Sequence, residues 1–201
     1  RGWRRGRRTR CRPAATTTTP YLYKNPQYNF DSDFVAAAAV GTGPMMIVVN
    51  SSSPVRTLSD LARVAKESGG RYNFAAGQIN SVPHLTGEML SRAGGMNLFT
   101  VPYAGSPAAV TAVLAGDAAV TIDGLPGVVQ HVKSGKLRAL AVTSDKRLPG
   151  FDDVPTVAET YKGFESIGWF GLFVPAKTPS AIVEQINAET NKALQNPELV
   201  R

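Results

Sequence analysis

One unit is repeated three times in residues 71–136, RYNFAAGQINSVPHLTGEMLSRAGGMNLFTVPYAGSPAAVTAVLAGDAAVTIDGLPGVVQHVKSGK. Each repeat has a short apolar strand, a loop of small residues, and a helix that begins at a Ser or a Pro. Strands and helices that alternate through connections of a few residues are typical of a mostly parallel, doubly wound sheet. The stretch therefore predicts an α/β fold, in which a further strand, LRALAVTS at residues 137–144, follows the third helix.

A helix is predicted at residues 57–70, upstream of the repeats. Thr57 takes the N-cap position, Asp60 stands three residues later, and Gly69 ends the helix. The apolar residues that share one face of this helix are Leu58, Leu61, Ala62 and Ala65.

Strands are predicted on both sides of this region. Upstream, the apolar runs FVAAAAV (34–40) and MMIVVN (45–50) suit two buried strands, because two glycines and a proline separate them. Downstream, turns interrupt residues 151–179, and only GWFGLFV is strand-like. A last helix is predicted at residues 179–196, with Thr178 as its N-cap.

The positive charge of the chain is concentrated at its start. The formal net charge is +7, and residues 1–19 hold seven arginines and no acidic residue, so the rest of the chain has 15 basic and 15 acidic side chains. A basic segment binds phosphates, but this one has no helical or strand period and no recognition motif for nucleic acid. We therefore expect a disordered Arg-rich tail and no nucleic-acid partner.

Polar residues gather where the predicted strands give way to helices. In an open α/β sheet, ligands bind beyond the carboxyl ends of the strands, and the unpaired N–H groups of a helix N-terminus suit a carboxylate or a phosphate. The candidate ligand-binding residues at these junctions are Gly77, Asn80, Ser81, His84, Tyr103, Gly105, Ser106 and Asp123.

The same residues have structural alternatives. Ser81 and Ser106 could cap their helices without contacting a ligand. His84 could close its own turn, Tyr103 could pack its ring, and Asp123 could start a turn or cap the next helix.

Motifs for catalysis, metals and cofactors are absent from the sequence. It has no H-E-x-x-H, no P-loop and no G-x-G-x-x-G, and Ser81 lies in no G-x-S-x-G motif. Cys11 is the single cysteine, which excludes an internal disulfide. We therefore expect no enzyme, no metal and no cofactor, with a small hydrolase acting through Ser81 and His84 as an alternative. No signal peptide and no run of the ~18 apolar residues that cross a bilayer is visible.

Five segments, in order, resemble the Bug or TctC-like substrate-binding receptors of tripartite tricarboxylate transporters. They are NFAAGQINSVPHLTGEML, VPYAGSPAAVTAVLAGD, SGKLRALAVTSDKR, DVPTVAE and WFGLFVPAKTPSAIVEQIN. The resemblance implies a type II periplasmic-binding-protein-like fold, whose two lobes close on a small carboxylate: a di- or tricarboxylate, an acidic amino acid or an aromatic acid. It also implies a periplasmic location and docking on membrane transporter subunits.

The resemblance implies one complete doubly wound lobe plus a partial second lobe in this chain. It assigns residues 50–144 to the complete second lobe and residues 20–49 and 145–201 to a partial first lobe, and it leaves residues 1–19 outside the family sequence. The second-lobe clasp corresponds to residues 77–84, whereas the first-lobe clasp and the C-terminal end of the family sequence are missing. We therefore expect MMIVV and GWFGLFV to have uncovered apolar edges, and ligand binding to be weak or absent.

A ligand-sensing domain of a transcriptional regulator is the alternative function, because such domains share this architecture. A regulator needs a helix-turn-helix before its sensor domain. Residues 1–19 have no helical period, so the sequence favours the receptor.

Overall fold

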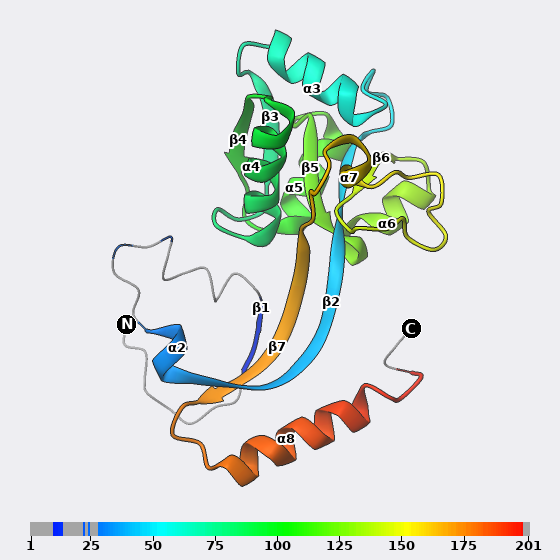
Figure 1. The fold of residues 1–201 in the computed structure, drawn as a ribbon. Helices are drawn as coiled ribbons and strands as arrows, with labels where there is room; N and C mark the ends of the chain where they lie inside the picture. Colours follow the sequence, from blue (N-terminus) through cyan, green and yellow to red (C-terminus); the bar gives the residue numbers. More distant parts are fainter. Residues whose placement is uncertain (1–9, 14–21, 23, 25–27, 199–201) are drawn as a thin grey trace. The chain divides into compact units, whose positions relative to one another are not determined.

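The computed structural model describes residues 10–13, 22, 24 and 28–198, and the chain divides into two compact units (Figure 1). Unit 1 comprises Arg1–Thr42 and Trp169–Arg201, and unit 2 comprises Gly43–Gly168. Unit 2 contains all of residues 50–144 and extends beyond them at both ends. The assignment of the units to the two lobes stays a prediction.

The described residues form the following helices and strands: β1 (Arg10–Pro13), α2 (Phe30–Asp33), β2 (Phe34–Asn50), α3 (Leu58–Glu67), β3 (Tyr72–Ala76), α4 (Val82–Gly94), β4 (Leu98–Pro102), α5 (Ser106–Ala115), β5 (Val120–Gly124), α6 (Leu125–Lys133), β6 (Leu137–Val142), α7 (Val157–Thr160), β7 (Ile167–Pro175) and α8 (Ser180–Ala193). None of the helices in this part of the chain is both long and apolar enough to cross a bilayer.

The sheet of unit 2 has the strand order β6-β2-β5-β3-β4. β3 pairs in parallel with β4 and β5, while β2 lies antiparallel to β5 and β6. The carboxyl ends of β3, β4 and β5 therefore lie at one end of the sheet, where α4, α5 and α6 begin. The predicted mostly parallel sheet is confirmed, with β2 as its antiparallel strand.

Helices cover both faces of this sheet. Side chains alternate along a strand, so Met45, Ile47 and Val49 of β2 face one side and Met46 and Val48 face the other; all five are at most 3% exposed. The first side packs against α3 and α4, and the second packs against α5 and α6. Each fully buried side chain of this size stabilises the fold by about 1.5–3 kcal/mol, so the two-sided burial of β2 anchors the doubly wound architecture.

Helix α3 forms where the sequence predicts it. Thr57 Oγ1 accepts from the N–H of Asp60 at 3.0 Å, and the Asp60 carboxylate accepts from the N–H of Thr57 at 3.1 Å, which is a capping box. The buried residues of the helix are the four predicted for its apolar face, Leu58, Leu61, Ala62 and Ala65. The prediction is confirmed.

Strand β2 is one strand of 17 residues, whereas the sequence predicted two. Gly41 and Gly43 do not break it, because neither has a positive φ and both continue the extended chain. The expectation that MMIVV has an uncovered edge is also wrong. Residues 45–49 pair with β5 on one edge and β6 on the other, so they form the buried centre of the sheet.

In unit 1, β1 pairs antiparallel with β7, from Arg10 opposite Phe173 to Pro13 opposite Phe170. The prediction that residues 1–19 lack regular structure is therefore wrong for Arg10–Pro13. A strand of four residues needs no side-chain period when a neighbouring strand supplies backbone hydrogen bonds. The other residues of that segment lie outside the described ones.

Helix α8 is tied to β2 by Asn187, whose Nδ2 donates to the carbonyl of Ala37 at 2.7 Å. The N-cap of α8 is Pro179, and the hydroxyl of Thr178 donates to the carbonyl of Pro175 at 2.7 Å. The predicted N-cap at Thr178 is therefore wrong, because the helix begins one residue later, after Pro179. None of the residues of α8 is buried, and Phe170 of β7 is 51% exposed.

An ion pair fixes the start of α7. Arg147 Nε and Nη2 donate to the two carboxylate oxygens of Glu159 at 2.9 and 2.7 Å. Arg147 and the backbone N–H of Thr156 lower the pKa of Glu159 from 4.5 to about 2. A carboxyl group with a lowered folded-state pKa contributes stability that is fully present above its unfolded pKa and is lost as the pH falls through its folded pKa.

We expect Glu159→Gln to be less stable than the native protein above about pH 5, and the difference to disappear as the pH approaches about 2. The difference should be small, because an ion pair between exposed side chains is screened by water. Thermal unfolding of both proteins across this pH range measures it, with Glu184→Gln on exposed α8 as the control. A Glu159→Gln deficit that is the same at every pH would contradict the assignment.

Candidate ligand-binding site

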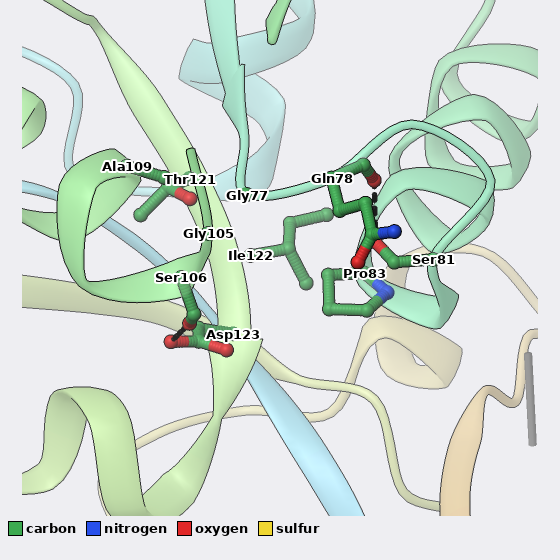
Figure 2. Close-up of a pocket in the computed structure, with 10 residues that line it drawn as sticks. All are labelled: Gly77, Gln78, Ser81, Pro83, Gly105, Ser106, Ala109, Thr121, Ile122 and Asp123. Atoms are coloured by element: carbon green, nitrogen blue, oxygen red, sulfur yellow. Dashed lines mark hydrogen bonds between the residues drawn. The ribbon is translucent and has the colours of Figure 1, made fainter. Parts of the chain in front are cut away.

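A pocket of about 140 Å³ lies in unit 2 at the carboxyl ends of β3 and β5, beside the start of α5 (Figure 2). Its lining residues are Gly77, Gln78, Ser81, Pro83, Gly105, Ser106, Ala109, Thr121, Ile122 and Asp123. All of them belong to unit 2. The position is the one that ligands take in open α/β sheets.

The loop between β3 and α4 is shaped by its own hydrogen bonds. Asn80 has the left-handed φ of 64°, and its N–H donates to His84 Nδ1 at 3.2 Å. Ser81 is the N-cap of α4: its Oγ accepts from the N–H of His84 at 3.4 Å and donates to the carbonyl of Gln78 at 2.7 Å. Ser81 therefore caps the helix and lines the pocket at the same time.

The β3–α4 and β4–α5 loops meet at two glycines. The N–H of Gly105 donates to the carbonyl of Gly77 at 2.6 Å. A Cβ on Gly77 would lie 2.7 Å from the backbone nitrogen of Ser106, closer than real Cβ atoms come. Gly105 has φ 108° and ψ 169°, a conformation found essentially only in glycine. Both positions need glycine for the two strand-to-helix junctions to come together.

Asp123 lies at the pocket with only 9% of its surface exposed. The hydroxyl of Ser106 donates to its Oδ2, and the N–H of Gly124 donates to its Oδ1 at 2.8 Å. A side chain on Gly127 would collide with the Asp123 carboxylate, so this carboxylate rests against the first turn of α6. Negative charge is stabilised at a helix N-terminus.

Helices α5 and α6 begin differently from α3 and α7. α3 and α7 begin with capping boxes, in which side chains bind the first N–H groups. The N-caps of α5 and α6 are Gly105 and Gly124, with no side-chain cap hydrogen bond. The first N–H groups of a helix have no intrahelical acceptor, so those at the start of α5 are suited to an anionic ligand.

The structure brings five of the eight predicted site residues together at the pocket: Gly77, Ser81, Gly105, Ser106 and Asp123. The other three are Asn80, His84 and Tyr103. Asn80 and His84 shape the loop, and Tyr103 packs against the apolar cluster under α5 and α6. Whether any of the eight binds a ligand stays a prediction.

Two features of the pocket differ from the sequence prediction. Ser106 is the first residue of α5 and not its N-cap, because the conformation of Gly105 already starts the helix and Asp123 accepts the Ser106 hydroxyl. Ala109, Thr121 and Ile122 were not predicted to line the pocket, whereas Gln78 and Pro83 fall within the predicted clasp of residues 77–84. Thr121 stands two residues before Asp123 in β5, and the strand period that places both on one face was present in the sequence.

Ser81 and His84 are not arranged as a nucleophile and its base. His84 Nδ1 accepts from a backbone N–H, and its Nε2 lies 3.7 Å from Glu88 Oε1. The hydroxyl of Ser81 is hydrogen-bonded to the backbone of its own loop. A nucleophilic serine needs its hydroxyl bonded to the base, so this geometry gives the hydrolase alternative no support. In the described part of the chain, no group of three or more His, Cys, Asp or Glu could hold a metal ion.

A mostly parallel sheet covered by helices on both faces, with a pocket where its strands end, defines a doubly wound α/β domain with a candidate ligand site. Comparison with known protein families shows which family the chain belongs to. The chain belongs to the tripartite tricarboxylate transporter receptor family, TctC, which matches residues 10–201. The predicted family is confirmed. Because it is a family of receptors, the prediction that the chain is not an enzyme is also confirmed. Residues 10–19 belong to the match, so the prediction that they lie outside the family sequence is wrong.

Among its relatives is a UPF0065 protein from the tcbD-tcbE intergenic region of Pseudomonas sp. (strain P51), which is 36% identical over 182 residues. These residues are 90% of this chain and 54% of that protein. The chain thus spans about half the length of this curated relative.

Solved structures share the fold. The periplasmic binding protein BugD is 34% identical with a TM-score of 0.87, over 95% of this chain and 64% of that chain. MatC from Rhodopseudomonas palustris with bound malate is 26% identical with a TM-score of 0.85, over 95% and 66% of the two chains. R. palustris Rpa4515 with adipate is 29% identical with a TM-score of 0.81, over 88% and 59%. The predicted type II periplasmic-binding-protein-like fold is confirmed.

Proposed function

We propose that this chain captures a small organic carboxylate in the pocket between the starts of α4 and α5, as a periplasmic receptor for a tripartite transporter. The observation that carries the proposal is the open N-terminus of α5 at the pocket, with Gly105 in place of a capping side chain. A carboxylate there accepts hydrogen bonds from N–H groups that have no other acceptor. Hydrogen bonds to a charged group contribute about 1.5–3 kcal/mol each.

The ligands of related structures support a small carboxylate as the ligand. Relatives of this fold have been solved with malate and with adipate, which are both small dicarboxylates. The pocket volume of about 140 Å³ suits a molecule of this size better than a drug-sized ligand. The family description and the name of BugD support transporter subunits as partners and a periplasmic location.

The affinity of this chain alone is expected to be weaker than about 1 µM. All of the lining residues come from unit 2. A ligand held by one unit makes fewer contacts than one enclosed between two, and binding must still offset the loss of translational and rotational freedom.

Backbone amide chemical shifts test the proposal, because they detect weak binding and locate it. We expect sodium malate, succinate and adipate to shift the amides of Gly77, Gln78, Gly105 and Ser106 in a saturable manner. Sodium chloride at the same ionic strength is the control. The proposal is wrong if the carboxylates cause only the shifts that sodium chloride causes, and submicromolar binding would overturn the expected weak affinity.

A further inference from the structure

Strand β4 is an open edge of the unit 2 sheet in the part of the chain that the structure describes. It ends the strand order β6-β2-β5-β3-β4, and Figure 1 shows it at the margin of the sheet. Edge strands have unpaired N–H and C=O groups, and proteins usually protect them with charged residues, bulges or prolines. β4 (LFTVP) has no charged residue, and its one proline is its last residue. Residues 98–101 therefore form an unprotected edge.

The backbone groups that point outward from β4 belong to alternate residues. The N–H of Tyr103, directly after β4, donates to the carbonyl of Ala76 in β3 at 2.8 Å. Because the backbone groups of successive residues in a strand point to opposite sides, those of Phe99 also point to β3. The N–H and C=O groups of Leu98 and Thr100 point away from the sheet, so they are placed to pair with another strand.

The side chain of Phe99 is largely uncovered. Thr100 Oγ1 donates to Glu88 Oε1 of α4 at 3.2 Å, and Leu98 packs against the core cluster beneath α3 and α4. Side chains alternate along a strand, so Phe99 lies on the opposite face, which α5 and α6 cover elsewhere. Phe99 is 60% exposed, the highest value for a large apolar side chain among the described residues. A partner at this edge would remove it from water.

Helix α4 has an acidic and a basic residue beside the same edge. Glu88 contacts Thr100, and Arg92 follows one turn later, about 6 Å along the helix axis. Because α4 connects the parallel strands β3 and β4, it runs opposite to β4. Arg92 is therefore level with Leu98, which lies about 7 Å from Thr100 along the strand. Arg92 is exposed and takes part in none of the ion pairs of the described chain.

We propose that β4 is a dimerisation edge, which pairs antiparallel with β4 of a second copy of this chain about a two-fold axis at Phe99. In this register Leu98 of each copy lies opposite Thr100 of the other, so all their outward N–H and C=O groups are paired. The Phe99 rings meet as a cross-strand aromatic pair.

Charge complementarity favours a second copy over an unrelated strand. The two-fold axis places the residue level of Thr100 in one copy beside that of Leu98 in the other. Glu88 of each copy therefore lies beside Arg92 of the other, and opposite charges meet twice. A two-fold contact also closes the edge, as in the commonest class of homo-oligomer. The surface lies outside the ligand pocket, so this inference does not depend on the proposed function.

Sedimentation equilibrium of the full chain tests the proposal. We expect a reversible dimer with a Kd on the order of 10–100 µM, because a short strand gives an interface at the small end of the size range. Phe99→Ser should raise the Kd at least about tenfold, the effect of losing a central aromatic contact. Phe170→Ser, at an exposed phenylalanine of unit 1, should leave it unchanged. A chain that is monomeric at about 1 mM, or a dimer that Phe99→Ser leaves intact, would overturn the proposal.

Charge reversal tests the proposed symmetry. Glu88→Arg alone and Arg92→Glu alone should each raise the Kd at least about threefold, because like charges then meet across the axis. The double variant exchanges the two charges in both copies and should restore the native Kd. A double variant as weak as the single variants would contradict the placement of Glu88 beside Arg92 of the second copy.

Disulfide cross-linking tests the register. In a Cys11→Ser background, Phe99→Cys should form a disulfide between copies, because the opposed Cα atoms would be about 4.5 Å apart. Val101→Cys should not, since its two copies would lie about 14 Å apart along the strands. Cross-linking at position 101 and not at 99 would overturn the proposed axis.

Discussion

Gly77→Ala is expected to lower the free energy of unfolding by about 1–3 kcal/mol, the usual cost of forcing an extra carbon into packed surroundings. The added Cβ would lie 2.7 Å from the Ser106 nitrogen and 2.9 Å from the Gly105 carbonyl carbon. Both are backbone atoms, so no side-chain rotation can relieve the contact. The loops must separate, which also breaks the 2.6 Å hydrogen bond from Gly105 to Gly77.

Gly43→Ala is the matched control for this substitution. Gly43 also belongs to unit 2, has no positive φ, and has nothing within 4 Å of the position that its Cβ would take. We expect its effect to stay within about 0.5 kcal/mol. Denaturant unfolding of both variants measures the difference between their free energies of unfolding. Equal values would contradict the prediction that the close approach of the two loops requires glycine at position 77.

Arg138→Met is expected to destabilise the protein by about 3 kcal/mol, because hydrogen bonds from a charged donor contribute about 1.5–3 kcal/mol each and are not additive. The Arg138 guanidinium donates to the carbonyls of Ser51, Ser53 and Val55 at 2.7, 2.9 and 3.1 Å. These carbonyls belong to the connection from β2 to α3. Methionine has similar length but no donor, so the three carbonyls lose their partner.

Two further variants isolate the role of the guanidinium group. Arg138→Lys should be intermediate, because an ammonium group keeps the charge but lacks the planar fork that reaches several carbonyls. Arg63→Met should change stability by less than about 1 kcal/mol, since its ion pairs with Asp60 and Glu67 are exposed. Chemical denaturation measures the stabilities of these variants. An Arg138→Met variant as stable as Arg63→Met would show that the hydrogen bonds of Arg138 do not stabilise the connection from β2 to α3.

The parts of the fold that the sequence predicted are those with local causes. Helix α3 has its capping box and its apolar face within its own residues, so no distant contact was needed to predict it. Strand β2 was divided wrongly, because glycine favours a break only when the surrounding chain does not hold it extended. The pairing of β1 with β7 joins residues far apart in the sequence and left no local pattern to detect.

In the candidate site, too, the features with local causes could be predicted from the sequence and the others could not. Gly77, Gly105 and Asp123, which the strand-to-helix junctions indicated, line one pocket, because parallel strands end at the same end of a sheet. They did not indicate that the Ser106 hydroxyl would turn to Asp123 instead of capping α5. The direction of the Ser106 hydroxyl depends on Asp123, which comes from β5, so no local pattern around Ser106 predicts it.

The position of β2 also governs when unit 2 can fold during synthesis. Residues 45–49 leave the ribosome first, yet their partners, residues 120–124 and 137–142, are made much later. Until then the most apolar strand of the unit has no neighbours, and pairing across such sequence distances is slow. The nascent chain therefore exposes an aggregation-prone segment until these partners are made, which makes it a candidate client for chaperones that bind extended apolar segments.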